Sequence, residues 1–197
     1  MKTALRFALT AGVVFALLMA PWPGLHAGYA ACFRVANEVA FSLFWMGGDV
    51  HFEPHAVAGE AADTYVRVVE SGGAAWYTLV ESRGAGWLPT AVFLALVLAT
   101  PISRRRKWRA LLAGGLLVQL YVVGLLWINL LEGLTKHAAR CPARQHGEWL
   151  GASWWHESLQ TVIVVFRLDP TVFVAVPVLV WLLVSVRRSD LEAWAQA

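Results

Sequence analysis

Long apolar segments alternate with polar stretches along this chain of 197 residues. Four segments are almost free of charge: Ala4–Ala20, Trp87–Ile102, Ala110–Leu131 and Thr171–Val186. A helix rises about 1.5 Å per residue, so it needs about 20 apolar residues to cross a hydrocarbon layer about 30 Å thick. The pattern therefore predicts a mainly α membrane protein with four transmembrane helices and a small external β region.

The polar stretches between these segments set the expected domain boundaries. Pro21-Trp22-Pro23 ends the first apolar segment abruptly, and the small-x-small cleavage triplets that follow it are poor, so the sequence favours an uncleaved signal anchor over a removed signal peptide. We expect five parts: a signal-anchor helix (1–24), an external periplasmic region (25–86), a transmembrane hairpin with a cytoplasmic basic loop at 103–109 (87–131), a second external region (132–170), and a last transmembrane helix with a cytoplasmic tail (171–197).

The spacing of apolar residues changes along the first external region. From Tyr29 to Trp45 the apolar residues have helical spacing, which predicts either an amphipathic helix on the membrane surface or a continuation of the first helix. Residues 64–70 and 76–81 are rich in β-branched and aromatic residues, and Ser71-Gly72-Gly73 between them is a turn signal. This pattern predicts a β-hairpin, to which residues 49–55 add a third strand.

Charge fixes the expected orientation. Five basic residues lie within Arg104–Arg109, and basic residues near a span stay on the cytoplasmic side. The segments expected inside carry nine basic residues and two acidic ones, which places both termini in the cytoplasm of a multi-pass protein of the inner membrane. The net charge is only +3, and its basic residues lie at membrane boundaries, so we expect lipid contact and exclude nucleic acid as a partner.

Acidic residues and histidines alternate at the expected third strand. Asp49, His51, Glu53 and His55 would share one face of a strand, because successive side chains point to opposite faces. Imidazole and carboxylate groups are ligands for zinc or copper, so these four residues are a candidate metal site. The alternative interpretation is a solvated polar face; no cofactor is otherwise predicted.

The two cysteines, Cys32 and Cys141, both fall in the expected external regions. An even pair in an oxidising compartment predicts a disulfide, against the alternative of two unpaired small residues. Cys141 also lies close in sequence to His137 and His146, which leaves open a Cys/His-dependent enzyme. No other group of residues resembles a catalytic site, so we assign no catalytic residues.

The arrangement resembles the small integral membrane proteins associated with exosortases, in particular the exosortase H-associated type. The residues that carry the resemblance are Gly86-Trp87-Leu88-Pro89 and the apolar run to Pro101, followed by Arg104-Arg105-Arg106-Lys107, and a last span ending in Arg187-Arg188. The resemblance implies a non-enzymatic accessory role in sorting or processing surface proteins, and it supplies no catalytic residues.

The sequence thus favours an accessory or scaffold protein that presents its external regions to an integral membrane partner. Two alternatives stay open at this point. One is an external metal-binding protein or Cys/His-dependent membrane enzyme, and the other is a structural subunit of a larger respiratory or photosynthetic complex.

Overall fold

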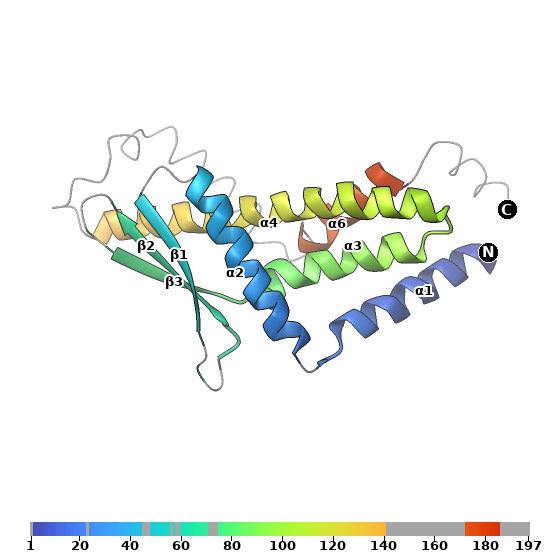
Figure 1. Cartoon of the computed structure of the whole chain (residues 1–197), viewed down its shortest axis with the longest axis horizontal. Helices are drawn as coiled ribbons and strands as arrows, with labels where there is room; N and C mark the ends of the chain where they lie inside the picture. Colours follow the sequence, from blue (N-terminus) through green and yellow to red (C-terminus); the bar gives the residue numbers. More distant parts are fainter. Residues whose placement is uncertain are drawn as a thin grey trace. The chain divides into compact units, whose positions relative to one another are not determined.

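A computed structural model of the chain describes residues 2–22, 24–44, 48–55, 57, 60–70, 75–140 and 172–185 (Figure 1). The chain forms two compact units. The helical unit comprises Met1–Trp22, Gly86–Tyr121 and Thr171–Ala197, and the sheet unit comprises Pro23–Ala85 and Val122–Pro170.

Apolar helices make up the described part of the helical unit. They are α1 (Lys2–Met19), α3 (Leu88–Ala99), α6 (Val172–Ser185) and the first part of the long helix α4 (Arg104–Arg140). Helix α3 follows the π-helical turn η1 (Arg83–Trp87) and has Pro89 in its first turn, where the missing N–H costs no hydrogen bond. It ends at Ala99 because Thr100 is extended (φ −67°, ψ 128°), the conformation favoured by a residue that precedes a proline, here Pro101.

The helices of this unit pack around one apolar cluster. Its buried residues come from three helices: Phe93 and Val97 of α3, Ala110 and Val118 of α4, and Trp181 of α6. Helix α1 joins the cluster through Phe7, whose ring stacks on that of Trp181 at 5.5 Å between centroids.

A glycine lets α3 and α6 approach α4 closely. A Cβ atom at Gly114 would overlap the ring of Phe93 and would lie 3.1 Å from Cγ2 of Val184. A Cβ at the neighbouring Gly115 would meet nothing within 4 Å. The small residue is therefore required for packing at position 114 and not at position 115.

Two hydrogen bonds between side chains join helices of the helical unit. The indole Nε1–H of Trp181 donates to the Thr100 hydroxyl oxygen at 2.8 Å, and that hydroxyl donates to the Leu96 carbonyl oxygen at 2.6 Å. Near the start of α3, the side-chain amide of Gln119 donates to the Thr90 hydroxyl oxygen at 3.2 Å. Such bonds between helices satisfy polar groups that would otherwise be costly in an apolar environment.

The sheet unit begins with helix α2 (Leu25–Phe44) and continues into an antiparallel sheet of β1 (Gly48–Pro54), β2 (Thr64–Glu70) and β3 (Ala75–Val80) in the order β1-β2-β3. Gly24, immediately before α2, has a φ of 77°, which separates α2 from the preceding segment. The strands occur where the alternation of β-branched and aromatic residues predicts them, with residues 48–54 supplying the third.

One face of the sheet forms the core of this unit. Val50 and Phe52 of β1 pair with Val68 and Val66 of β2, and all four side chains are buried. Helix α2 packs on β1, where the rings of Phe41 and Phe52 lie 5.6 Å apart. The later part of α4 covers Trp76 of β3: a Cβ at Gly133 would lie 2.6 Å from Cζ3 of its indole.

The Asp63 carboxylate ties the start of β2 to the residue that follows β3. Its carboxylate accepts hydrogen bonds from the hydroxyl of Ser82 at 2.6 Å, from the backbone N–H of Ser82 at 3.1 Å and from the hydroxyl of Thr64 at 2.8 Å. Ser82 and Thr64 are both buried, so the carboxylate replaces water for three donors that have no access to it.

The prediction of four transmembrane helices is wrong. Among the described residues, one helical stretch, Arg104–Gly133 of α4, is long and apolar enough to cross a bilayer. The other apolar helices, Ala4–Met19, Arg83–Ala99 and Val174–Ser185, have fewer than 18 residues. Two of these helices end next to a proline: α1 ends at Met19, before Pro21, and α3 ends at Ala99, before Pro101. The apolar composition of a segment therefore does not measure the length of its helix.

The basic segment predicted as a loop at 103–109 is also different in the structure. Helix α4 begins at Arg104, and the N–H of Lys107 already bonds to the carbonyl oxygen of Ser103 at 2.9 Å. Arginine and lysine are good helix formers, so a run of them lengthens the following helix instead of interrupting it.

Candidate functional site

The four candidate metal ligands lie on or directly after β1. Asp49, His51 and Glu53 are exposed, while Val50 and Phe52 between them are buried. The alternation that the sequence predicts for this strand is therefore present, with the polar side chains on the outer face of the sheet. His55 follows the end of the strand, where its N–H bonds to the Asp63 carbonyl oxygen at 2.9 Å.

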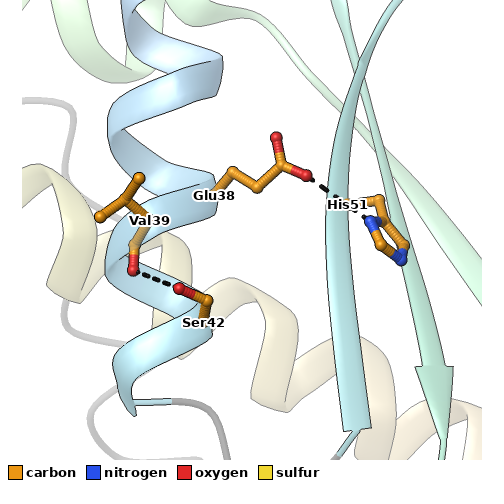
Figure 2. Close-up of polar contacts among 4 residues, drawn as sticks. All are labelled: Glu38, Val39, Ser42 and His51. Atoms are coloured by element: carbon orange, nitrogen blue, oxygen red, sulfur yellow. Dashed lines mark hydrogen bonds and ion pairs between the residues drawn. The ribbon is translucent and has the colours of Figure 1, made fainter.

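The two histidines of this group pair with two different glutamates. Nδ1 of His51 lies 3.5 Å from Oε1 of Glu38 on α2, and both side chains are about half exposed (Figure 2). Nε2 of His55 lies 2.8 Å from Oε2 of Glu60. No set of three or more His, Cys, Asp or Glu side chains within the described ranges is placed to hold a metal ion. The zinc or copper site at Asp49, His51, Glu53 and His55 stays a prediction.

Sequence reasoning did not find either glutamate. Glu38 belongs to α2 and reaches β1 only because α2 packs along this strand, and Glu60 lies in the connection between β1 and β2. Neither residue stands at a ligand-like spacing from its histidine. The packing of α2 on β1, which a single sequence does not encode as a local pattern, brings Glu38 to His51. The connection after β1, where the N–H of Glu60 bonds to the Val57 carbonyl oxygen, brings Glu60 to His55.

Aromatic rings stack across the outer face of the sheet. The rings of His55 and Tyr65 lie 6.3 Å apart, and those of Tyr65 and Tyr77 lie 5.1 Å apart, each pair nearly parallel. Tyr77 on β3 is 66% exposed and Leu79, on the same face, is 42% exposed. This face combines exposed apolar and aromatic groups, which is typical of a surface that contacts another protein.

A second apolar surface of the sheet unit is the outer side of α2. Val35, Val39 and Leu43 are all more than half exposed and recur every four residues. The charged residues of this helix face the sheet instead: Arg34 donates to the Asp63 carbonyl oxygen at 3.5 Å, and Glu38 pairs with His51 (Figure 2). The outer side of α2 therefore presents no charge.

The structure describes one of the two cysteines. Cys32 is exposed on α2, whereas Cys141 lies outside the described residues, so the disulfide between them stays a prediction. His146 also lies outside these residues, and His137 falls in the last turns of α4. The Cys/His enzyme that these residues suggested has no described geometry.

The helical unit exposes long apolar stripes. Leucine or valine recurs every four residues on α1 and α4 and twice on α6, and each of these side chains is more than half exposed: Leu5, Leu9, Val13, Leu17, Leu112, Leu116, Leu120, Leu179 and Leu183. Contiguous apolar surface on this scale marks contact with lipid or with another protein.

No protein-family model, curated protein or solved structure matches this chain. The likeness to exosortase-associated membrane proteins therefore stays a resemblance.

Proposed function

We propose that this protein is a non-enzymatic accessory protein of the cell membrane, held there by its helical unit, which presents its sheet unit to an integral membrane partner. The observation that carries the proposal is the set of apolar stripes on α1, α4 and α6. Their exposed leucines and valines face outward from a unit whose core is already filled by Phe93, Val118 and Trp181.

The free energy at stake is large compared with the stability of a small domain. Burying one Leu or Val side chain fully is worth about 1.5–3 kcal/mol. Nine such side chains are more than half exposed. Transferring them out of water would therefore be favourable by on the order of 10 kcal/mol. Folded proteins are stable by about 5–15 kcal/mol, so a lipid solvent removes a penalty of the same size.

Helix α4 supplies the crossing that the proposal needs. Its stretch Arg104–Gly133 has 30 residues and spans about 45 Å at 1.5 Å per residue, more than the hydrocarbon thickness of about 30 Å. Its first residues are basic, which favours the cytoplasmic side for that end. The shorter helices α1, α3 and α6 pack with the first part of α4, and the apolar stripes of α1 and α6 face lipid.

The sheet unit is the part offered to a partner. Within the sheet unit, Gly133 of α4 packs on Trp76. Tyr77 and Leu79 of β3 and the uncharged outer side of α2 are exposed. The resemblance to exosortase-associated proteins favours a partner in the sorting of surface proteins.

Copurification tests the proposal. The tagged chain is expressed from its chromosomal locus, solubilised in mild detergent and analysed by mass spectrometry. We expect a stoichiometric integral membrane protein, lost in the variant Tyr77→Ser with Leu79→Ser. The control, Leu112→Ala with Leu116→Ala, changes the stripe on α4 and should retain the partner. A chain that is purified alone, or a partner retained after combined serine substitution of Tyr77, Leu79, Val35 and Val39, would refute the accessory role.

A further inference from the structure

The charged residues in the described part of the helical unit are all basic. Its described residues include seven basic residues and no aspartate or glutamate: Lys2, Arg6, Arg104, Arg105, Arg106, Lys107 and Arg109. The start of α1, the end of α3 and the start of α4 lie at the same end of this unit (Figure 1). The positive charge is thus concentrated at one end and has no acidic counterpart within the described part of the unit.

Two of these basic side chains stabilise helix ends. Nζ of Lys107 donates to the Leu98 carbonyl oxygen of α3 at 2.7 Å, and Nη2 of Arg106 donates to the Ser185 carbonyl oxygen of α6 at 3.0 Å. The last carbonyls of a helix lack partners within the helix and carry the negative end of its dipole, so a cation there is favourable. Arg106 and Lys107 therefore serve the packing of the unit itself.

The other three basic residues at the start of α4 have no such role. Arg104, Arg105 and Arg109 are exposed, and no hydrogen bond or ion pair joins them to another described residue. Trp108 among them is 58% exposed. Tryptophan beside arginine is typical of the level of the lipid headgroups, where the ring is half in hydrocarbon and the guanidinium meets phosphate.

This arrangement is electrostatically unfavourable without an anion. The start of α4 carries the positive end of the helix dipole, and its first turn contains no acidic residue. Like charges three or four residues apart on a helix also repel each other, as Arg105 and Arg109 do here. Negative charge from outside the chain would offset both effects.

We propose that Arg104, Arg105 and Arg109 form a binding surface for the headgroups of anionic phospholipids. The ligand is the phosphate diester of a lipid with net negative charge, such as phosphatidylglycerol; a zwitterionic headgroup carries a choline or amine that the arginines repel. Arginine binds phosphate oxygens through two parallel N–H groups, which lysine does not do. The inference rests on the proposed membrane location, because it needs this end of the unit at a lipid surface.

The test uses the full chain purified in a neutral detergent. Dioleoylphosphatidylglycerol or dioleoylphosphatidylcholine is added in mixed micelles, and bound lipid is counted by native mass spectrometry. We expect a preference for phosphatidylglycerol that weakens with salt. Each basic residue near an anionic surface contributes about a fivefold affinity, so Arg104→Gln with Arg105→Gln and Arg109→Gln should reduce it by about 100-fold.

Two further variants separate charge at this surface from charge in general. Arg104→Lys with Arg105→Lys and Arg109→Lys keeps the charge and should retain most of the preference. Arg67→Gln removes an exposed arginine from the sheet unit and should change nothing. Equal binding of the two lipids by the natural chain, an unchanged preference in the triple glutamine variant, or an equal loss in the Arg67 variant would overturn the inference.

Alkaline carbonate extraction of membranes distinguishes this inference from the proposed function. If the natural chain is released by carbonate, the membrane location itself has failed. If the chain stays in the membrane and shows no preference between the two lipids, only the headgroup surface has failed.

Discussion

Replacing Gly114 by alanine should destabilise the helical unit, whereas the same change at Gly115 should not. The added methyl group at position 114 would overlap the ring of Phe93 and press on Val184. Phe93 has no exposed surface and is packed against Trp181 and Val97, so its ring has no space to move into. At position 115 the same methyl group meets nothing within 4 Å.

Comparing the two variants isolates the free-energy cost of fitting the added methyl group into the core. Alanine stabilises a helix relative to glycine by about 0.5–1 kcal/mol, and this gain applies equally to two adjacent positions of α4. Extra volume in a packed core costs about 1–3 kcal/mol. The difference between Gly114→Ala and Gly115→Ala should therefore be about 1–3 kcal/mol, with the variant at 114 the less stable.

Thermal unfolding in detergent, followed by tryptophan fluorescence, measures this difference. For a chain of this size, 1 kcal/mol shifts Tm by about 2–4 °C, so the two variants should differ by about 2–12 °C. Both are heated at the same scan rate, because the apparent Tm depends on it when unfolding is irreversible. Equal Tm values, or a higher Tm for the variant at 114, would show that α3 and α6 do not pack on α4 at this glycine.

Two further predictions concern the sheet unit. Gly133→Ala should lower the Tm relative to Gly124→Ala, because a Cβ at 133 would lie 2.6 Å from the Trp76 ring and a Cβ at 124 meets nothing; equal values would contradict this packing. Asp63→Ala leaves the buried Ser82 with two unpaired donors and should cost about 2–4 kcal/mol, measured by denaturant unfolding, while Asp63→Asn, which keeps an acceptor oxygen, should cost less.

The β region was predictable because its signals are local. The β-branched residues in 64–70 and the turn signal in the sequence Ser71-Gly72-Gly73 predict a hairpin, and β2 does pair with β3 in an antiparallel manner. The exposed and buried alternation in β1 was equally local. These parts of the fold depend on neighbours in sequence, which is the information that a hydropathy pattern contains.

The number of membrane-crossing helices was not predictable in the same way. Composition showed that four segments are apolar, but α3 ends after 12 residues and α4 extends to Arg140 with its basic start included. Helix ends depend on proline positions and on side chains that reach carbonyls of other helices, such as Lys107 at Leu98. The residues that form such contacts lie apart in the sequence, so a local pattern does not reveal them.

The pairing of polar side chains was beyond sequence reasoning for a related reason. The alternation of Asp49, His51, Glu53 and His55 was visible, but the partners Glu38 and Glu60 come from other elements. Which glutamate meets which histidine depends on how α2 and the connection after β1 pack against the strand.

Single-cysteine labelling across the membrane tests the central claim most directly. Arg105→Cys marks the basic start of α4, and Arg67→Cys marks the exposed face of the sheet. Both are made with the natural cysteines replaced by serine and with an unchanged Tm. A membrane-impermeant maleimide should label position 67 in cells with an opened outer membrane and an intact inner membrane, and position 105 only after the inner membrane is permeabilised. Labelling of both positions before permeabilisation, or recovery of the chain in the soluble fraction, would contradict an accessory protein that crosses the membrane through α4.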